Sequence, residues 1–332
     1  MTRRERVIAA IDFKKTDYIP YSVSFTGQML EKMKKYTGNA DYLDTLNNHI
    51  FMIDLIKPQT ELKSGFFQDE YGVVWNKTGA DKDIGVIDHI TLKDVDDLGN
   101  FEFPPVDESF IRSTMEKIIR DSGDRFRIAG IGFSLFERAW TLRGMENLLC
   151  DMLLEPELTE ALLDKIVERN MKILDIALEY DIDAVYFGDD WGQQRGLIMG
   201  PACWRKYIKP RVKQLYDRVH NSGRYVVQHS CGDIREILDD LYEVGLNVYQ
   251  TFQPEIYGLE YAEKMYGKIC VWGGISTQKQ LPFMTPDEIS SVTKQLLRAF
   301  PNGGLIAAPT HSVPGDVPPE NILAMISVFD RQ

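Results

Sequence analysis

A histidine and a cysteine stand two residues apart at the end of a short apolar segment, in the stretch Tyr225-Val-Val-Gln-His-Ser-Cys-Gly-Asp233. Side chains at positions i and i+2 of an extended segment point to the same side. His229 and Cys231 can therefore reach one point in space, and imidazole with thiolate is a ligand pair that zinc favours. A zinc site needs three or four ligands. The structural alternative is a buried cysteine beside a hydrogen-bonded histidine.

Polar residues also follow other apolar segments that we expect to be strands. His311 follows the segment 305–308 and is the third candidate metal ligand. Asp189 and Asp190 follow the segment 184–188, and adjacent strand positions face opposite ways. At most one of the two carboxylates is therefore expected to act as a catalytic group. The alternative is that the pair caps the following loop.

Aromatic and amide side chains at the same strand ends are candidates for the walls of a substrate pocket. An arginine after an earlier strand is a candidate for holding a substrate carboxylate. These predicted substrate-binding residues are Tyr186, Trp191, Phe252, Gln253 and Arg138.

Strand-like and helical segments alternate along most of the chain, which predicts βαβ units and a parallel sheet. About eight strand candidates, with no linker or composition shift, favour one α/β domain over residues 1–332, a closed (β/α)₈ TIM barrel. No G-x-G-x-x-G follows a strand, and there is no P-loop. The predicted strands are 18–25, 127–134, 184–188, 225–228, 248–252, 269–273 and 305–308, with a β-hairpin at 67–75. The predicted helices are 3–12, 28–36, 109–121, 144–154, 156–180, 201–220, 233–243, 258–266, 286–299 and 319–329. In such a barrel, functional groups gather where strands end and βα loops begin.

The composition is that of an ordinary globular protein of 332 residues, with 44% hydrophobic residues and a net charge of -12. The acidic balance argues against partners such as nucleic acid or an anionic membrane surface. Four scattered cysteines favour a reducing compartment. The first residues lack the long apolar run of a signal peptide, and no stretch reaches the length of a membrane span. We therefore expect a cytoplasmic protein.

Seven short motifs are spread over nearly the whole chain: Thr2-Arg-Arg-Glu-Arg-Val7, Asp17-Tyr-Ile-Pro20, Asp189-Asp-Trp-Gly-Gln-Gln194, His229-Ser-Cys-Gly232, Gly273-Gly-Ile275, Gly303-Gly-Leu-Ile-Ala-Ala-Pro309 and Pro318-Pro-Glu-Asn321. Together these motifs resemble the uroporphyrinogen decarboxylase-like superfamily, which also contains zinc-dependent methyltransferases acting on corrinoid proteins and thiols. The resemblance runs nearly end to end and implies a single (β/α)₈ barrel.

The resemblance implies two competing chemistries. True uroporphyrinogen decarboxylases need no metal and hold an anionic tetrapyrrole with arginines after the first strand, whereas this chain has no arginine between Arg6 and Arg112. The methyltransferase branch is marked by a His-x-Cys element and a cysteine after the last strand. His229 and Cys231 match the first element, and His311 stands where the late cysteine would fall.

The resemblance therefore favours an enzyme that uses Zn²⁺ to move a methyl group between a corrinoid, free or on a partner protein, and a small-molecule thiol. A thiol that coordinates a metal loses its proton. The alternative enzyme is a metal-free decarboxylase (carboxy-lyase) of uroporphyrinogen or of a smaller carboxylate substrate. There Asp189 or Asp190 would stabilise a cationic intermediate, and the carboxylate would be held by Arg138, Arg143 or Arg195. A third alternative is a corrinoid- or tetrapyrrole-binding subunit without turnover.

Overall fold

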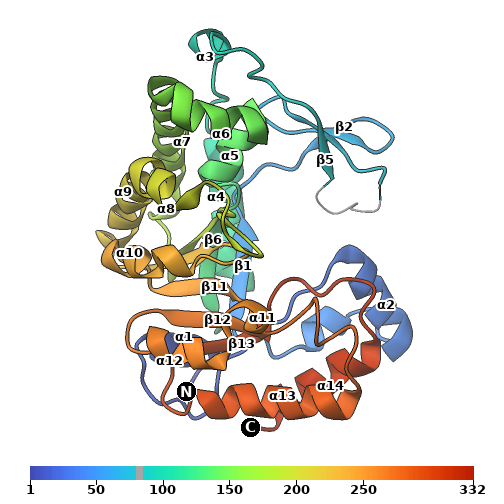
Figure 1. Cartoon of the computed structure of the whole chain (residues 1–332). Helices are drawn as coiled ribbons and strands as arrows, with labels where there is room; N and C mark the ends of the chain where they lie inside the picture. Colours follow the sequence, from blue (N-terminus) through green and yellow to red (C-terminus); the bar gives the residue numbers. More distant parts are fainter. Residues whose placement is uncertain (80–84) are drawn as a thin grey trace.

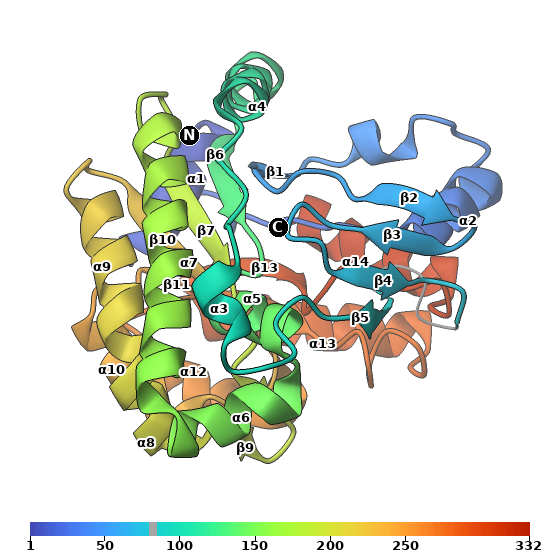
Figure 2. The ribbon, with the colours of Figure 1, turned by 90° about the horizontal axis from the view of Figure 1, so that it is seen from above.

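A curved sheet of seven parallel strands, with helices on its outer face, forms the centre of the computed structural model (Figures 1 and 2). The structure describes residues 1–79 and 85–332. Each strand pairs with the next one in a parallel register, as βαβ connections require. The predicted α/β barrel class is confirmed. The strands, in sheet order, are β1 (Ile50–Asp54), β6 (Phe126–Ile131), β7 (Ala184–Gly188), β10 (Tyr225–His229), β11 (Val248–Phe252), β12 (Cys270–Ile275) and β13 (Leu305–Pro309).

The prediction of a regular strand at 18–25 is wrong. The segment lies between β13 and β1, but it forms no continuous ladder with either of them. It makes only two isolated bridges, from Tyr21 to Ala307 and from Phe25 to Val313. On its other side, the His49 amide donates to the Tyr21 carbonyl at 2.9 Å. Beyond that point the Asn48 side chain takes the place of a neighbouring backbone, since its amide group bonds both the amide and the carbonyl of Val23. No ladder with β1 can form there.

The sequence prediction misses β1, which lies in the region 48–107 that shows little periodicity. Its burial changes from buried at Ile50 to exposed at Met52 and Asp54, although alternation points all three to the same side. An inward-facing strand with exposed residues indicates an open space inside the barrel, and this is why the hydrophobic pattern of β1 is weak.

Helices cover the outside of the sheet, and most lie within a few residues of their predicted bounds. Thr2 and Thr285 each begin a helix with a capping box, in which Glu5 or Glu288 returns a hydrogen bond. The principal helices are α1 (Arg3–Ile11), α2 (Gly27–Thr37), α4 (Glu108–Asp121), α5 (Phe136–Arg143), α6 (Met145–Leu154), α7 (Pro156–Ala177), α9 (Lys209–His220), α10 (Leu238–Glu243), α12 (Leu259–Met265), α13 (Pro286–Ala299) and α14 (Pro319–Asp330). The shorter helical segments are η1 (Tyr42–Thr45), α3 (Asp97–Asn100), α8 (Gly200–Cys203), η3 (Arg235–Ile237) and α11 (Pro254–Tyr257).

The predicted helix 201–220 is interrupted. A π-helical turn, η2 (Trp204–Ile208), separates α8 from α9. Pro210 stands in the first turn of α9, and its missing N–H removes the α-helical hydrogen bond to the preceding turn.

A small antiparallel sheet extends from the barrel between β1 and β6, seen at the upper right of Figure 1. Its strands β3 and β4 form the predicted hairpin near 67–75. The strands are β2 (Thr60–Lys63), β3 (Phe66–Gln68), β4 (Val74–Asn76) and β5 (Val86–His89). We call the segment 60–79 together with 85–89 the arm. A further short hairpin is formed by β8 (Gly192–Gln193) and β9 (Gly196–Leu197).

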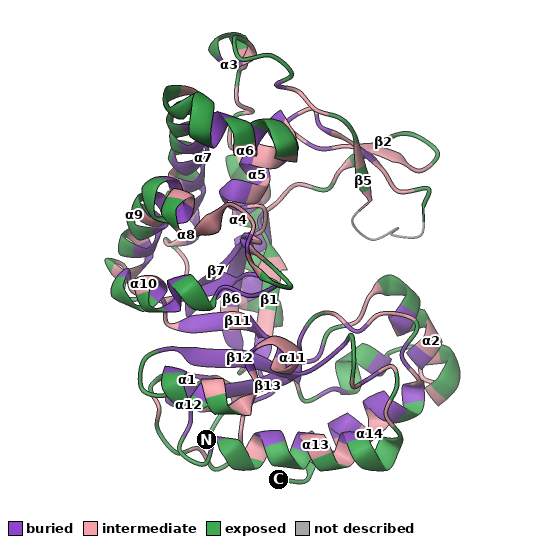
Figure 3. Cartoon of the chain, viewed as in Figure 1, coloured by how far each residue is buried: buried purple, intermediate pink, exposed green. Residues whose placement is uncertain are grey.

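Two apolar layers hold the fold together. One fills the barrel interior, where Ile128, Val227 and Ile306 meet, and the other lies between the sheet and the helices. Figure 3 shows the strands largely buried and the outer helix faces exposed. Among the described helices, none combines the length and apolar character needed to cross a bilayer.

Candidate metal centre

The loop after β10 carries His229 and Cys231 and is held on several sides. The Cys231 amide donates to Asp190 Oδ1 at 2.8 Å, and the Gly232 amide donates to Gln253 Oε1 at 2.8 Å. The Tyr257 hydroxyl donates to the Gly232 carbonyl at 2.8 Å. These bonds from the segments that follow β7 and β11 fix the loop backbone and with it the direction of the cysteine thiol.

The loop after β13 carries His311 and is bound to both of its neighbours. The Thr310 amide donates to the Ile275 carbonyl at 2.8 Å, and its hydroxyl lies 3.1 Å from that of Thr277. On the other side, the Val313 amide donates to the Ser24 carbonyl at 2.8 Å. The loop therefore holds its histidine over the same end of the barrel as the loop after β10.

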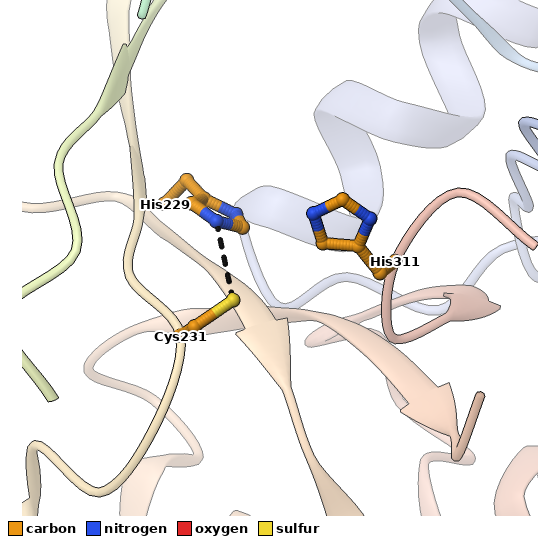
Figure 4. Close-up of side chains that lie close together, drawn as sticks. All are labelled: His229, Cys231 and His311. Atoms are coloured by element: carbon orange, nitrogen blue, oxygen red, sulfur yellow. Dashed lines mark hydrogen bonds between the residues drawn. The ribbon is translucent and has the colours of Figure 1, made fainter. Parts of the chain in front are cut away.

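His229, Cys231 and His311 converge at this end of the barrel (Figure 4). Their donor atoms all lie within 4.8 Å of one another, and Cys231 Sγ is 3.5 Å from His229 Nε2. In a tetrahedral zinc site, donor atoms lie roughly 3.4 to 3.8 Å apart. The His229–Cys231 pair already has this spacing. His311 is exposed, and a side-chain rotation that moves its ring by about 1 Å would bring its nitrogen to the same distance from the other two donor atoms. Two imidazoles and one thiol at these distances have the ligand chemistry of a zinc site.

Hydrogen bonds orient the imidazole of His229 toward the other two donors. Its Nδ1 contacts Gln250 Oε1, an acceptor, so a proton belongs on Nδ1, and Nε2 points toward Cys231 Sγ at 3.5 Å. Asp190 Oδ1 lies 3.2 Å from Nε2. Burial acts to raise the pKa of Asp190, but its contact with His229 holds that pKa below the usual value. His311 keeps an exposed surface, but the protein atoms around its ring displace enough water to lower its pKa, which favours the neutral imidazole that a metal binds.

Asp189 and Asp190 point in opposite directions. Asp190 faces the histidines, whereas Asp189 is fully buried and accepts the amides of Leu135, Phe136 and Glu137 at the start of α5. Burial raises the pKa of Asp189 to about 6, although these hydrogen bonds act to lower it. The structure thus places Asp190 in the candidate site and Asp189 behind it, as the link between β7 and α5.

Two further carboxyl groups border the site, and neither was assigned from the sequence. Asp54 ends β1, and its Oδ1 occupies the space where a side chain at Gly130 would be. Although part of Asp54 is exposed, loss of water around its carboxyl group raises its pKa. Burial raises the pKa of Glu137 well above the usual value, and the nearby Asp190 and Asp189 add to the effect. Asp54 was not predicted as a site residue because the strand that it ends, β1, was not predicted. Gln250 could have been found, since it is polar and faces inward in a predicted strand.

Two cavities meet at His311 and Ser312. One of about 110 Å³ contains His229, Tyr186, Gln250 and Trp272 in its wall, and one of about 620 Å³ contains Cys231, Gln253 and Asp316. The smaller cavity also adjoins a third of about 610 Å³, with which it shares Ser22, Ser24, Met52 and Trp272. This third cavity lies where the segment 20–25 and β1 lack a ladder, so the site opens both at the mouth and at the side of the barrel.

The predicted substrate-binding residues divide into two groups. Tyr186 and Gln253 line the cavities at the centre. Trp191 and Phe252 are fully buried, against Trp204 and Tyr257 respectively, and belong to the core. Arg138 is 4% exposed, and its guanidinium pairs with Asp69 at 2.8 Å.

The structure is a parallel α/β barrel in which two histidines and a cysteine converge at the carboxyl ends of the strands. Comparison with known proteins identifies the family. The family model for uroporphyrinogen decarboxylase (URO-D) matches residues 79–332, and the chain belongs to this family.

Relatives in the family are distant. The uroporphyrinogen decarboxylase of Geotalea uraniireducens (strain Rf4) is 21% identical over 256 residues, covering 73% of this chain and 70% of the relative. That of Geobacter sulfurreducens is 22% identical over 253 residues, with the same two coverages. Among solved structures, a methyltransferase from Methanosarcina mazei superposes with a TM-score of 0.71 at 18% identity, covering 99% of this chain and 98% of that one. The family comprises enzymes, and the structural likeness concerns the fold.

Proposed function

We propose that this protein is a zinc-dependent methyltransferase that transfers a methyl group between a corrinoid and a small thiol. The observation that carries the proposal is the convergence of His229, Cys231 and His311, with donor atoms within 4.8 Å of one another. Two imidazoles and one thiolate suit zinc, and three protein ligands leave a position for substrate. The fold shared with a methyltransferase is consistent with this choice.

Bound zinc would act as a Lewis acid that lowers the pKa of a thiol substrate. The protein residues would orient the reactants. Gln250 keeps the His229 proton on Nδ1, and Asp190 fixes the Cys231 backbone. The sulfur would attack the methyl carbon, forming a sulfur–carbon bond as the cobalt–carbon bond breaks and leaves its electron pair on cobalt. The corrinoid would approach from the open mouth.

Decarboxylation is the second candidate, because the curated relatives carry that name. Its substrate, uroporphyrinogen, carries several carboxylates, and burying these calls for fixed cations. No described residue lining the two cavities at His311 is a lysine or an arginine, and the two arginines that line the adjoining 610 Å³ cavity already have partners: Arg3 pairs with Asp124, and Arg125 donates to the carbonyls of Asp121 and Ser122. The arginine predicted for this role, Arg138, is already paired with Asp69. Both observations favour methyl transfer.

The direct test is metal analysis of the protein purified without chelator. We expect about one zinc ion per chain. His229→Ala and Cys231→Ala should each weaken zinc binding by more than about a hundredfold, since loss of a mere outer-shell partner already costs 10- to 100-fold. The matched control is His89→Ala, an exposed histidine on β5, which should bind zinc normally.

Turnover is tested by incubating the zinc-loaded protein with methylcobalamin and a thiol and following demethylation of the corrinoid by its absorbance. Wild-type protein without bound metal, or carbon dioxide release from uroporphyrinogen without methyl transfer, would contradict the proposal.

A further inference from the structure

The 610 Å³ cavity between the segment 20–25 and β1, called here the side cavity, adjoins the candidate metal centre. It shares four wall residues with the 110 Å³ cavity at His229 and His311, namely Ser22, Ser24, Met52 and Trp272. A molecule that lies in the side cavity can therefore extend to the candidate metal ligands without passing through the mouth of the barrel.

Most of the wall of the side cavity is apolar. Its apolar residues include Val23, Phe25, Leu43, Leu46, Phe51 and Met52. Two of these side chains keep a large accessible surface, since Leu43 is 41% and Met52 is 38% exposed. Covering apolar surface that faces water is favourable. Pockets for small molecules have walls of this kind and volumes of roughly 300 to 1,000 Å³, so the side cavity suits an apolar ligand.

The polar residues of the same wall are mostly engaged within the protein. Arg3 pairs with Asp124, and Arg125 donates to two backbone carbonyls. The Asn48 side chain bonds to a backbone amide and a backbone carbonyl. Asp44 is exposed and solvated by bulk water. A strongly polar ligand would exchange its own hydration for few free partners here, whereas an apolar ligand has no such hydration to lose.

The centre has a second opening at the mouth of the barrel. The 620 Å³ cavity contains Cys231 in its wall and meets the 110 Å³ cavity at His311 and Ser312. When a thiolate displaces cobalt from a methyl carbon, sulfur and cobalt lie on opposite sides of that carbon, so the two reactants approach from different directions. Two openings to one centre suit this requirement, with the corrinoid at the mouth and the thiol at the side.

We infer that the acceptor is a thiol with an apolar body, an alkyl or aryl chain, which lies in the side cavity while its sulfur reaches the His-Cys-His set. This inference rests on the proposed function and adds to it the class of the acceptor and its route of entry. Leu43, Phe51 and Met52 are the residues that select the apolar body. A thiol without such a body leaves their surfaces facing water and binds more weakly.

The test uses the full-length protein loaded with Co²⁺, because a sulfur ligand changes the absorption spectrum of bound cobalt without any need for turnover. Two thiols are titrated, 3-phenyl-1-propanethiol and 1-propanethiol, which share the same alkyl thiol end and differ by the phenyl ring. The ratio of their dissociation constants therefore isolates the contribution of the apolar body. In the wild type, the phenyl compound should bind at least about tenfold more tightly, as expected for burial of an aromatic ring.

Two variants change the side cavity without touching the candidate metal ligands. Met52→Trp fills the junction with the centre from a position that is already 38% exposed, and it should lower the ratio at least about fivefold while cobalt remains bound. Leu43→Asn adds no bulk and makes the wall polar, and it should lower the ratio about threefold. The control Leu153→Trp places the same ring on α6, at a side chain that is 74% exposed, and should leave the ratio unchanged.

Equal binding of the two thiols by the wild type, or an unchanged ratio in both Met52→Trp and Leu43→Asn, would overturn the assignment of an apolar acceptor to the side cavity while leaving thiol binding intact. A ratio that falls toward one as the protein concentration is raised would show that a second copy of the chain covers the side cavity, and would overturn the assignment as well. If neither thiol alters the cobalt spectrum, the proposed thiol-binding function itself fails, and the assignment fails with it.

Discussion

Single hydrogen bonds decide what the side chains of the centre do. Asp189 and Asp190 are neighbours with the same chemistry. Asp189 accepts hydrogen bonds from three backbone amides at the start of α5, whereas Asp190 faces His229. Gln250 has no reactive group, but its contact with His229 Nδ1 turns the other ring nitrogen toward Cys231 and Asp190. Residue type alone does not distinguish these roles.

His49 shows the same dependence on its surroundings, with a consequence for stability. Its ring is fully buried, packs against Tyr18 and Tyr21, and leaves Nε2 without a hydrogen-bond partner among the described residues. Burial lowers the pKa of His49 to about 4. The imidazole is therefore neutral in the folded protein at pH values where the unfolded chain is protonated.

We expect the free energy of unfolding to fall as the pH decreases from about 6.5 toward 4, because only the unfolded state takes up the His49 proton in this range. The full effect is about 3 kcal/mol. Denaturant titrations at pH 7 and pH 5 should show a smaller pH dependence in His49→Gln than in the wild type, and an unaltered one in His89→Gln. If the free energy of unfolding changes by the same amount between pH 7 and pH 5 in the wild type and in His49→Gln, groups other than His49 govern the acid sensitivity.

At the scale of the elements, the centre depends on close contact between the loops after β7 and β10. Gly232 has φ +81°, and a Cβ there would lie 2.3 Å from the carbonyl carbon of Gly192. These two glycines allow the backbones to touch directly beside Cys231. A side chain at either position would separate the loops and displace the thiol.

Gly232→Ala should therefore destabilise the protein and weaken its metal binding. Its matched control is Gly223→Ala, which has a similar φ of +74° and nothing within 4 Å of the added methyl. Both substitutions should cost about 1 to 2 kcal/mol through backbone strain, and Gly232→Ala should cost roughly 1 to 3 kcal/mol more through the clash. Denaturant titration and zinc affinity measure the two effects. Equal losses in both variants would exclude the contact as the cause.

At the scale of the whole molecule, buried ion pairs bind the arm to the barrel. Arg138 of α5 pairs with Asp69 and lies 4.1 Å from the Tyr71 ring, while Arg169 of α7 pairs with Glu70 at 2.7 Å. The segment 69–71 therefore inserts between two barrel helices. This arrangement gives Arg138 a structural role in place of the predicted contact with substrate.

Arg138→Met should destabilise the protein by about 3 to 5 kcal/mol, because it leaves the Asp69 carboxylate buried without its partner. Adding Asp69→Asn should recover part of this loss, since the amide still accepts the backbone bonds from Tyr71 and Val73. Zinc content should stay unchanged in both variants. Unchanged stability combined with a raised KM would instead point to the substrate-binding role.

The sequence by itself determined the barrel class, most helix bounds and the pairing of His229 with Cys231. These features depend on local periodicity, on helix caps such as Thr2 and Thr285, and on the two-residue repeat of a strand. Each of these patterns depends only on residues close together in the chain, so it can be recognised within a single segment of the sequence.

Only the tertiary structure decided which distant residues share the site. It brought a ring nitrogen of His311 to within 4.8 Å of the donor atoms of the other two candidate ligands, revealed β1 with Asp54, and separated Asp189 from Asp190. It also placed Arg138, Trp191 and Phe252 in buried positions. The physical reason is that direction and proximity across a barrel follow from strand register and loop hydrogen bonds between segments far apart in the chain. No local pattern of residues encodes these contacts.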